Sequence, residues 1–291
     1  MTVPCRKGET VKTPKKQAFM EVLAISLSED CRFPVLEVFT FLYVVATIFF
    51  SNMNFGSGSV VLFQFILTDE ALIFSIIKGL TGFPIFFLLL LITKNIAFGL
   101  GNDLEMGTMQ TFLSYPLSRK MLLTARLVSS VGVEILLFLG IQVCVLYIMA
   151  PYLVSTYITT IILSYVAALC FPLFITGVAL MLSLVLKKGS WGLIIGIIMQ
   201  FVMQILTTIA SNLNTAGSEI IVKISSVINP IIALDRYYRS SPQHFVQEYF
   251  FGSNIWSPSF SEAIYYIGAG FVLVIFIFLA AYLYFDRRLE I

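Results

Sequence analysis

Long apolar stretches separated by short polar ones dominate the pattern of this chain. A helix needs about 20 apolar residues to cross the hydrocarbon core of a bilayer. Stretches that approach or exceed this length lie at 33–50, 71–98, 121–150, 157–186, 191–210 and 263–285. The pattern therefore predicts an all-α integral membrane protein with six transmembrane helices, which form a single membrane domain over 33–291.

A shorter apolar segment at 60–67 does not fit this series. Its length is too small for a span, so we expect it to lie at the outer membrane interface. If it joined the following stretch instead, the chain would cross seven times and the C-terminus would change sides. Arg287 and Arg288 near the C-terminus argue against that alternative.

The composition supports a membrane protein. Hydrophobic residues make up 58% of the chain, charged residues only 12%, and the mean hydropathy is +0.94. Soluble domains contain about 25% charged residues, so an ordinary soluble domain is excluded. The basic residues form no patch interleaved with aromatic ones, so we expect no nucleic-acid partner.

The distribution of basic residues predicts the orientation of the spans. With six spans, fourteen of the eighteen Lys and Arg residues lie on the side of the N-terminus, and four lie on the other side. Cytoplasmic loops carry an excess of Lys and Arg. Both termini are therefore expected in the cytoplasm, with the protein crossing the plasma membrane several times. Residues 1–32 form the expected cytoplasmic N-terminus, without the features of a cleaved signal peptide.

Within that N-terminus, residues 18–27 have the pattern of an amphipathic helix. Phe19, Leu23 and Leu27 share one face, whereas Glu21 and Ser28 lie away from it. Such a helix, with basic residues before it, is suited to lie on the inner surface among anionic lipid headgroups. The alternative is that the segment is only the start of the first span.

The polar stretch 101–120 forms the first cytoplasmic loop of this topology, between spans two and three. Apolar residues recur in it at helical spacing, at Leu104, Met106, Met109, Phe112 and Leu113. The acidic residues Asp103 and Glu105 stand at its start, and Pro116 ends the pattern. The sequence predicts a short helix over 103–114 whose apolar ridge suits a groove of a cytoplasmic partner.

The same stretch carries a recognisable motif. It consists of Glu105, Gly107, Thr108, Leu113, Ser114, Pro116, Ser118 and Arg119, followed by the basic residue Arg126. This run resembles the pattern of the ABC-2-type permeases, the membrane subunits of ATP-driven exporters. Arg126 departs from it, because a lysine is commoner there. The family has six spans, an amphipathic helix before the first, and a larger external region between spans five and six, so the resemblance covers nearly the whole chain.

The resemblance implies that the 103–114 helix is a coupling helix that contacts a separate ATP-binding subunit. The residues that carry this implied contact are Asp103, Leu104, Glu105, Gly107, Thr108, Phe112, Leu113, Pro116 and Arg119. The chain has no Gly-rich phosphate loop ending in Gly-Lys-Ser/Thr. ATP and Mg²⁺ would therefore bind the partner subunit, and this chain would hold no cofactor and catalyse no reaction. The further expected partners are a second permease, identical or related, and membrane lipid.

Polar residues inside the apolar stretches are candidates for a translocation pathway. They are Glu37, Glu134, Gln142, Gln200 and Gln204. Ionisable groups within spans are costly, and they often mark function. The alternative is that they form hydrogen bonds between helices, which is common in membrane bundles. Glu37 could also lie in the headgroup zone.

The region 211–261 is the expected external segment between spans five and six. Its dense aromatic residues are typical of a membrane interface. The resemblance implies short external helices that cap the pathway, with Tyr237, Tyr238, Phe250 and Phe251 as an outer gate. The alternative is an aromatic belt without gating. His244, the only histidine, has no second ligand at helical spacing, so no metal site is expected.

Two other functions remain open. A standalone channel or ion-coupled carrier would need no ATPase, but it would be expected to show inverted repeats or an intramembrane ion relay. Only Glu37 and Glu134 are available for such a relay. A membrane anchor that recruits a cytoplasmic complex through the 101–120 loop is the third possibility.

Overall fold

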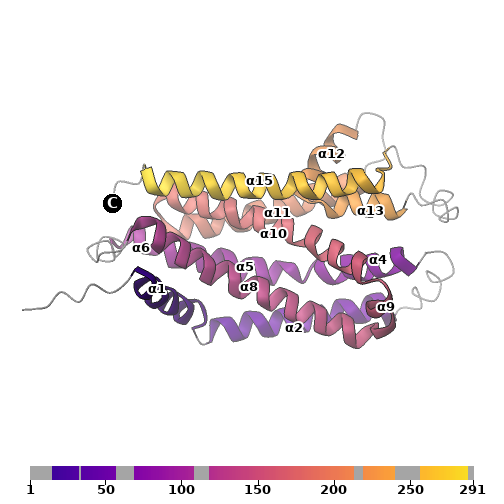
Figure 1. The fold of residues 1–291 in the computed structure, drawn as a ribbon, viewed down its shortest axis with the longest axis horizontal. Coiled ribbons are helices and arrows are strands. Elements are labelled where there is room, and N and C mark those ends of the chain that lie inside the picture. The colour runs from indigo at the N-terminus through magenta and orange to yellow at the C-terminus, as the bar shows by residue number, and fades with distance from the viewer. Residues whose placement is uncertain are drawn as a thin grey trace, which may run out of the picture.

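The computed structural model describes residues 15–32, 34–56, 69–107, 118–212, 219–239 and 256–287. Within these ranges every regular element is a helix. Figure 1 shows the long helices running side by side along one axis, which gives the described part of the chain the form of an elongated bundle. The short apolar segment at 60–67, expected at the outer membrane interface, lies outside the described residues.

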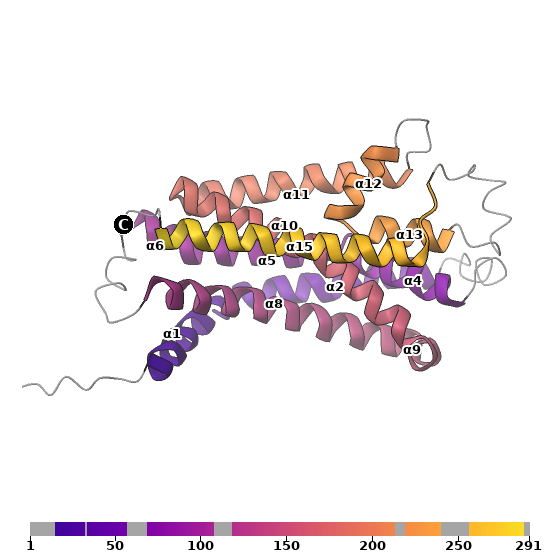
Figure 2. The same ribbon diagram turned by 45° about the horizontal axis from the view of Figure 1, so that its top comes forward.

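The N-terminal half supplies one side of the bundle. It contains α1 (Lys15–Asp30), α2 (Val35–Gly56), α4 (Asp69–Thr81), α5 (Ile85–Ile96), the π-helical turn η1 (Ala97–Gly101), α6 (Asn102–Glu105) and α8 (Arg119–Met149). The C-terminal half contains α9 (Pro151–Thr156), α10 (Ile158–Leu186), α11 (Gly189–Asn212), α12 (Glu219–Ile228), α13 (Ile231–Arg239) and α15 (Phe260–Arg287). Figures 1 and 2 agree that α1, α2 and α8 lie on one side, and α11 and α15 on the other.

Helix α10 lies in the interior, where it contacts α4, α5, α11 and α15. Its sequence is apolar on all sides, as expected for a helix surrounded by other helices. Helices α8 and α15 instead expose large apolar side chains along one face, for example Leu136 on α8 and Val272 on α15. In a membrane these faces would contact lipid, so the pattern of burial agrees with a membrane-embedded bundle.

Four helical segments are long and apolar enough to cross a membrane. They are Ile85–Glu105, Arg119–Ile148, Ile158–Leu186 and Phe260–Arg287. A fifth arises if Phe19–Asp30 and Val35–Phe50, which meet at a bend of 62°, form one span. The described part of the chain is therefore all-helical, with four to five helices able to span a membrane, and the first half of α11 (Gly189–Val202) is a shorter apolar segment.

The expected second span, 71–98, is wrong as a single unbroken helix. The structure has α4 and α5 there, separated at Gly82, Phe83 and Pro84. Proline has no backbone N–H and its ring collides with the preceding turn, so a helix cannot pass through Pro84 undisturbed. Lys78 and Lys94 consequently lie on two different helices.

The predicted separate helix over 103–114 also differs from the structure. Its first residues form α6, which continues directly from α5 through η1 and ends at Glu105. Gly107 adopts a φ of 72°, in the left-handed region that glycine tolerates and a helix cannot use. The helical pattern read across Gly107 was therefore wrong at that residue, and residues 108–117 lie outside the described ranges.

The helix expected at 18–27 lies within α1, but the face predicted to be apolar, with Phe19, Leu23 and Leu27, is only half-buried. Its buried face contains Val22, Ser26 and Asp30, while Glu21 and Ser28 are exposed. Helix α1 packs against α8 at the end of the bundle where α6 also lies (Figure 1). The C-terminal end of α15 lies at this same end, which we call the α1 end.

The opposite end carries α12 and α13, two short helices within the expected 211–261 region. Asp235 of α13 forms an ion pair with Lys78 of α4, with 2.8 Å between Oδ1 and Nζ. Asp235 is almost fully buried whereas Lys78 is about one-third exposed. This contact joins α13 to α4.

Candidate functional site

A row of polar side chains follows one face of α8. Arg126, Ser130, Glu134 and Gln142 lie at multiples of four residues, so they share a face of the helix. Ser129 stands beside them, and we call these five residues the α8 polar stripe. From Arg126 to Gln142 the stripe covers roughly 24 Å of helix. All five side chains are buried, so the stripe faces the interior of the bundle.

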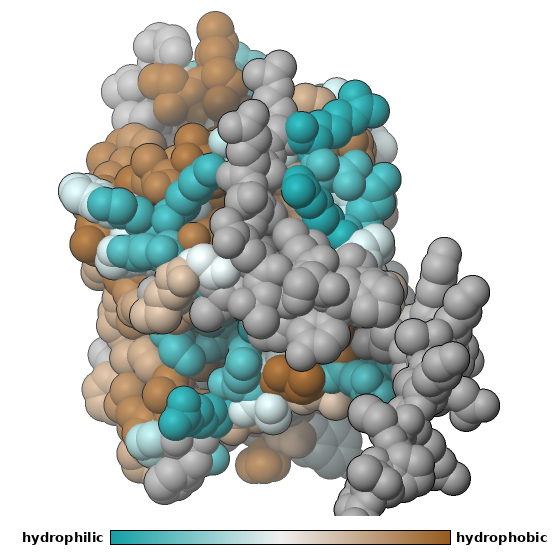
Figure 3. Space-filling view, turned by 90° about the vertical axis from the view of Figure 1, so that its left-hand side faces the viewer, coloured by the Kyte–Doolittle hydropathy of each residue, from teal (hydrophilic) through white to brown (hydrophobic). Residues whose placement is uncertain are grey.

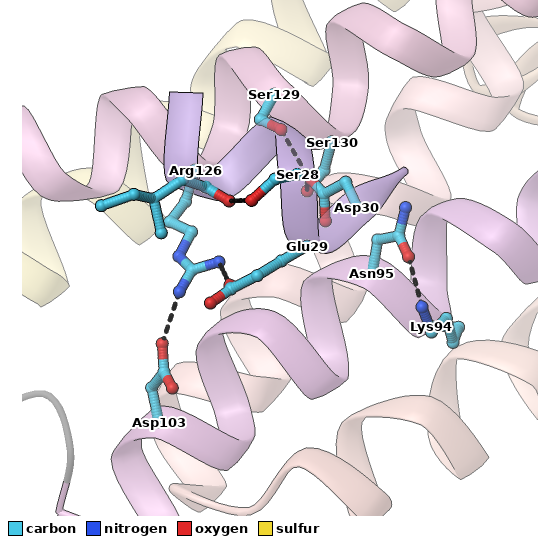
Figure 4. A network of polar contacts seen from close by, with 10 residues as sticks. Ser28, Glu29, Asp30, Lys94, Asn95, Asp103, Arg126, Ser129 and Ser130 are labelled. Atoms are coloured by element: carbon cyan, nitrogen blue, oxygen red, sulfur yellow. Dashed lines mark hydrogen bonds and ion pairs between the residues drawn. The ribbon is translucent and has the colours of Figure 1, made fainter. Parts of the chain in front are cut away.

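At the α1 end, Arg126 joins three elements. Its Nη1 donates to Oε2 of Glu29 on α1, and its Nη2 donates to Oδ2 of Asp103 on α6 at 2.9 Å (Figure 4). Arg126 is only 7% exposed. Guanidinium–carboxylate contacts of this kind are among the stronger hydrogen bonds in proteins. The arginine therefore holds the end of α1 and the start of α6 against α8.

Asp30 at the end of α1 makes the next contact along the stripe. Its Oδ2 accepts hydrogen bonds from Ser129 at 2.5 Å and from Ser130 at 2.9 Å. Burial raises the pKa of Asp30 above its ordinary value, while the two serines, Arg126 and Lys94 partly oppose that rise. Two successive acidic residues of α1, Glu29 and Asp30, are thus both attached to α8.

Glu134 lies deeper and meets α5. Its Oε1 accepts from Nδ2 of Asn95 at 3.4 Å, and Oδ1 of Asn95 accepts from Nζ of Lys94 at 2.8 Å. Oε2 of Glu134 has no hydrogen-bond partner among the described residues. A carboxyl group buried in an apolar helix is costly, which makes Glu134 the most unusual member of the stripe.

Gln142 is the last residue of the α8 polar stripe, about one helical turn beyond Phe138. Its Nε2 donates to the hydroxyl of Tyr43 at 2.7 Å and to the backbone oxygen of Leu80 at 3.1 Å. These bonds tie α8 to α2 and α4. Gln142 therefore acts as a contact between helices, which was the alternative to a pathway role for the glutamines.

A cavity of about 620 Å³ opens at the α1 end, between α1, the start of α2, α5 and α6. Its charged lining consists of Glu29, Asp30, Arg32, Lys94 and Asp103. Figure 3 shows this end of the bundle face on, with hydrophilic side chains gathered there and hydrophobic ones towards the margins. The cavity thus combines charged groups with apolar side chains at the end of an apolar bundle.

The residues expected at the ATPase contact differ in their burial and in the residues that they contact. Asp103 belongs to the Arg126 cluster, Leu104 packs against the core, and Glu105 is exposed. Gly107 follows α6 in its left-handed conformation, and Arg119 begins α8. Thr108, Phe112, Leu113 and Pro116 lie outside the described residues.

The candidate pathway residues do not gather at one place. Glu37 is exposed in the first turn of α2, and Glu134 and Gln142 are buried on α8. Gln200 is buried on α11, and the side chain of Gln204 lies outside the described part. None of the four described candidates lines the cavity at the α1 end.

Two of the aromatic residues expected at the outer gate, Tyr237 and Tyr238, are described, and both pack α13 against neighbouring helices. Tyr238 stacks on Phe74 of α4 with ring centroids 4.8 Å apart, and Tyr237 lies 5.5 Å from Phe260 of α15. Phe250 and Phe251 lie outside the described residues. Tyr237 and Tyr238 therefore attach the end helices to the bundle.

Several important residues were not singled out from the sequence as parts of a site. They are Glu29, Asp30, Asn95, Ser129, Ser130 and the pair Lys78–Asp235. The four-residue spacing of Arg126, Ser130 and Glu134 is a signal that could have revealed the stripe. Its partners on α1 and α5 carry no such signal, because they lie far away in the sequence.

No protein-family model matches the chain, and no curated protein is significantly similar to it in sequence.

Proposed function

We propose that this chain is the permease subunit of an ABC exporter. In this proposal it forms the translocation pathway as a dimer with a second permease, and separate cytoplasmic ATP-binding subunits drive it. The plasma membrane, with the α1 end in the cytoplasm, is its proposed location. The proposal rests first on the resemblance of the stretch from Glu105 to Arg126 to the ABC-2-type pattern.

The structural observation that carries the proposal is the pair of contacts made by Arg126. An ATP-driven movement at the end of a bundle can only be transmitted through contacts that join the receiving surface to the spans. Asp103 lies two residues before the exposed Glu105, and it is ion-paired to Arg126 on the long helix α8. Glu29 links α1 to the same guanidinium. A partner that pushed on α6 would therefore move α1 and α8 with it.

The continuity of α5, η1 and α6 supports the same mechanism. The end of α6 is the direct extension of a helix long and apolar enough to span a membrane. A short loop would absorb a push, whereas a continuous helix passes it along its axis. The π-helical turn within this continuous segment is an irregularity that often occurs at functional positions.

A second candidate, an ion-coupled carrier, is favoured by Glu134. This carboxyl is fully buried on α8, and Lys94 reaches it through Asn95. Such a group could bind and release a proton or cation during transport. The carrier would work without an ATPase, which separates the two candidates experimentally.

The test is co-purification of an ATPase with the chain. The protein is expressed with the neighbouring genes of its source genome, purified in mild detergent through a tag, and assayed for ATP hydrolysis. We expect wild type to bring down an ATP-binding subunit and Glu105→Arg to lose it, because a charge reversal at an exposed contact repels the partner. Glu70→Arg, at another exposed acid, on α4, is the matched control and should keep the partner. Wild-type eluates without an ATP-binding subunit, in conditions where transport persists, would favour the carrier.

A further inference from the structure

The cavity at the α1 end has an unusual balance of charge. Three carboxylates line it, from Glu29, Asp30 and Asp103, together with the cations of Arg32 and Lys94. Arg126 adds a third cation in direct contact with two of these carboxylates. A ligand with a net charge of either sign would upset this balance, whereas a zwitterion would leave it intact.

The charges are also ordered along the cavity. Lys94 lies on α5, and Asp103 lies nine residues further on, roughly 13 Å closer to the end of the bundle. Glu29 and Asp30 lie between Lys94 and Asp103 in Figure 4. The deeper part of the cavity therefore presents the cation of Lys94, and the part nearer the end presents the three carboxylates, two of which also contact Arg126. In a membrane leaflet, the headgroup of a zwitterionic phospholipid has the complementary order, because its phosphate lies deeper than its amine.

The remaining lining fits the apolar part of such a lipid. Pro34, Val35, Phe98 and Met106 line the cavity as well, and Phe98 and Met106 are 41% and 71% exposed. Pro34 and Val35 stand at the start of α2, which lies farther from this end of the bundle than α6 (Figure 1), so they would contact the glycerol and upper acyl chains of a lipid. A soluble zwitterion would leave this apolar surface in water.

The hydrogen-bond acceptors of the cavity favour a primary ammonium group over the quaternary ammonium of choline. A primary ammonium group has three N–H donors, and the carboxylates of Glu29, Asp30 and Asp103 offer acceptors for them. The quaternary ammonium of choline has no such donors and is typically held by a cage of aromatic rings. Among the described residues that line the cavity, Phe98 is the one aromatic side chain.

From these observations we propose that the cavity at the α1 end binds the headgroup of phosphatidylethanolamine. Lys94 meets the phosphate, and the carboxylates of Glu29, Asp30 and Asp103 meet the ammonium group. The buried Asn95, which accepts a hydrogen bond from Lys94, positions that lysine. The site requires only that the bundle is embedded in a membrane, so it stands independently of the proposed ATPase partner.

The test measures which lipid the purified protein retains. The full chain is exchanged into nanodiscs with equal amounts of phosphatidylethanolamine, phosphatidylcholine and phosphatidylglycerol, then extracted in mild detergent and analysed by native mass spectrometry. We expect phosphatidylethanolamine to be retained at least about tenfold more strongly than the other two, a difference of ~1.4 kcal/mol. Equal retention of the three lipids would overturn the proposal.

Two pairs of variants locate the site. Lys94→Gln removes the phosphate contact, and Lys188→Gln makes the same change at an exposed lysine outside the cavity. Gly99→Leu fills the cavity without altering charge, and Gly140→Leu adds the same side chain on α8, where a Cβ meets nothing within 4 Å. We expect Lys94→Gln and Gly99→Leu to abolish the preference and both controls to keep it. A preference that survives both cavity variants would place the lipid elsewhere and contradict the proposal.

A competition experiment tests whether the cavity binds a lipid or a soluble molecule with the same headgroup. Glycerophosphoethanolamine, added in excess to the lipid-loaded protein, should leave the phosphatidylethanolamine bound, because it lacks the acyl chains that would contact Pro34 and Val35. Displacement of the lipid at equimolar concentration would mean that the site takes a soluble zwitterion, and it would overturn the assignment to lipid.

Discussion

Arg126 is a nearly buried charge at the α1 end that contacts two carboxylates. A nearly buried guanidinium loses its hydration, and that cost is offset only when its donors meet well-placed acceptors. Arg126 meets two, on elements 97 and 23 residues away. The planar fork of arginine suits two carboxylates at once, whereas the single ammonium of lysine does not. This geometry gives a reason for arginine where the ABC-2 pattern commonly has lysine.

Replacing Arg126 should therefore have graded effects. Arg126→Met should lower the free energy of unfolding by about 2 kcal/mol, because two charged hydrogen bonds are lost while the half-exposed Glu29 regains water. Arg126→Lys should cost about half as much, since one carboxylate can still be reached. Thermal unfolding in detergent measures both, with the exposed Lys188→Met as control. Equal melting temperatures for wild type and Arg126→Met would contradict the role given to this residue.

Asp30 makes a prediction about pH. Its pKa in the native protein is raised from 3.8, chiefly by burial, so the native state holds this proton at higher pH than the unfolded chain does. The contribution of Asp30 to stability is therefore greatest below pH 3.8. It falls as the pH rises to the raised native pKa and then stays constant. Asn accepts the same serine hydrogen bonds without ionising, so Asp30→Asn should remove this fall.

The measurement is thermal unfolding of wild type and Asp30→Asn between pH 4 and 8. The difference in melting temperature should shift in favour of the variant as the pH rises. Glu21→Gln, at an exposed acid of the same helix, should run parallel to wild type. Parallel curves for wild type and Asp30→Asn would show that Asp30 titrates normally.

Among the elements, α11 packs unusually closely against its neighbours. A Cβ placed on Gly192 would lie 2.0 Å from Oγ of Ser183, and one on Gly196 would lie 2.6 Å from Cγ2 of Thr93. At Gly101 of η1 the obstacle is backbone, because a Cβ would lie 2.5 Å from Cα of Gly189. Small residues allow membrane helices to approach closely, and here they bring α11 against α10, α5 and η1.

Alanine at these glycines should test the packing. Gly101→Ala should lower the free energy of unfolding by about 2–3 kcal/mol, because no side chain can move away from the new methyl group. Gly192→Ala should cost less, since the Ser183 side chain can rotate. Gly140→Ala meets nothing within 4 Å and should be neutral or stabilising by about 0.5–1 kcal/mol, as alanine favours a helix. Chemical unfolding in detergent would rank the three; a similar cost at all positions would refute the close approach.

The positions of the long helices were largely predictable from the sequence. The apolar stretches 121–150 and 157–186 correspond to Arg119–Met149 and Ile158–Leu186. Hydrophobicity over some 20 residues is a local property, so it can be read without knowing the fold. The break at Pro84 and the end of α6 before Gly107 were visible as residues, but the apolar pattern on both sides concealed them.

The candidate site was much less predictable. Glu134 and Gln142 stood out because polar residues are rare in apolar stretches, and the structure places both on the α8 polar stripe. Glu29 and Asn95 did not, since nothing local indicates that they meet Arg126 and Glu134. Contacts between residues 97 or 39 positions apart depend on how the helices pack, which hydropathy does not encode.

The whole described molecule is joined by polar contacts at both ends. At the α1 end Arg126 connects α1, α6 and α8, and Lys120 of α8 pairs with Asp286 of α15 at 3.2 Å. At the opposite end Lys78 and Asp235 connect α4 to α13. Apolar packing fills the length between them. A bundle joined in this way would respond as a unit to a force at one end, as the proposed permease requires.

The decisive measurement is site-specific photo-crosslinking at Met106, which follows α6 and is 71% exposed. A photoreactive amino acid replaces Met106 in cells, and crosslinked proteins are identified by mass spectrometry. Tyr265 of α15, 69% exposed at the opposite end, provides the matched control. The permease proposal predicts an ATP-binding subunit crosslinked at 106 and absent at 265. Crosslinks at 106 only to lipid, or the same proteins at both positions, would contradict it.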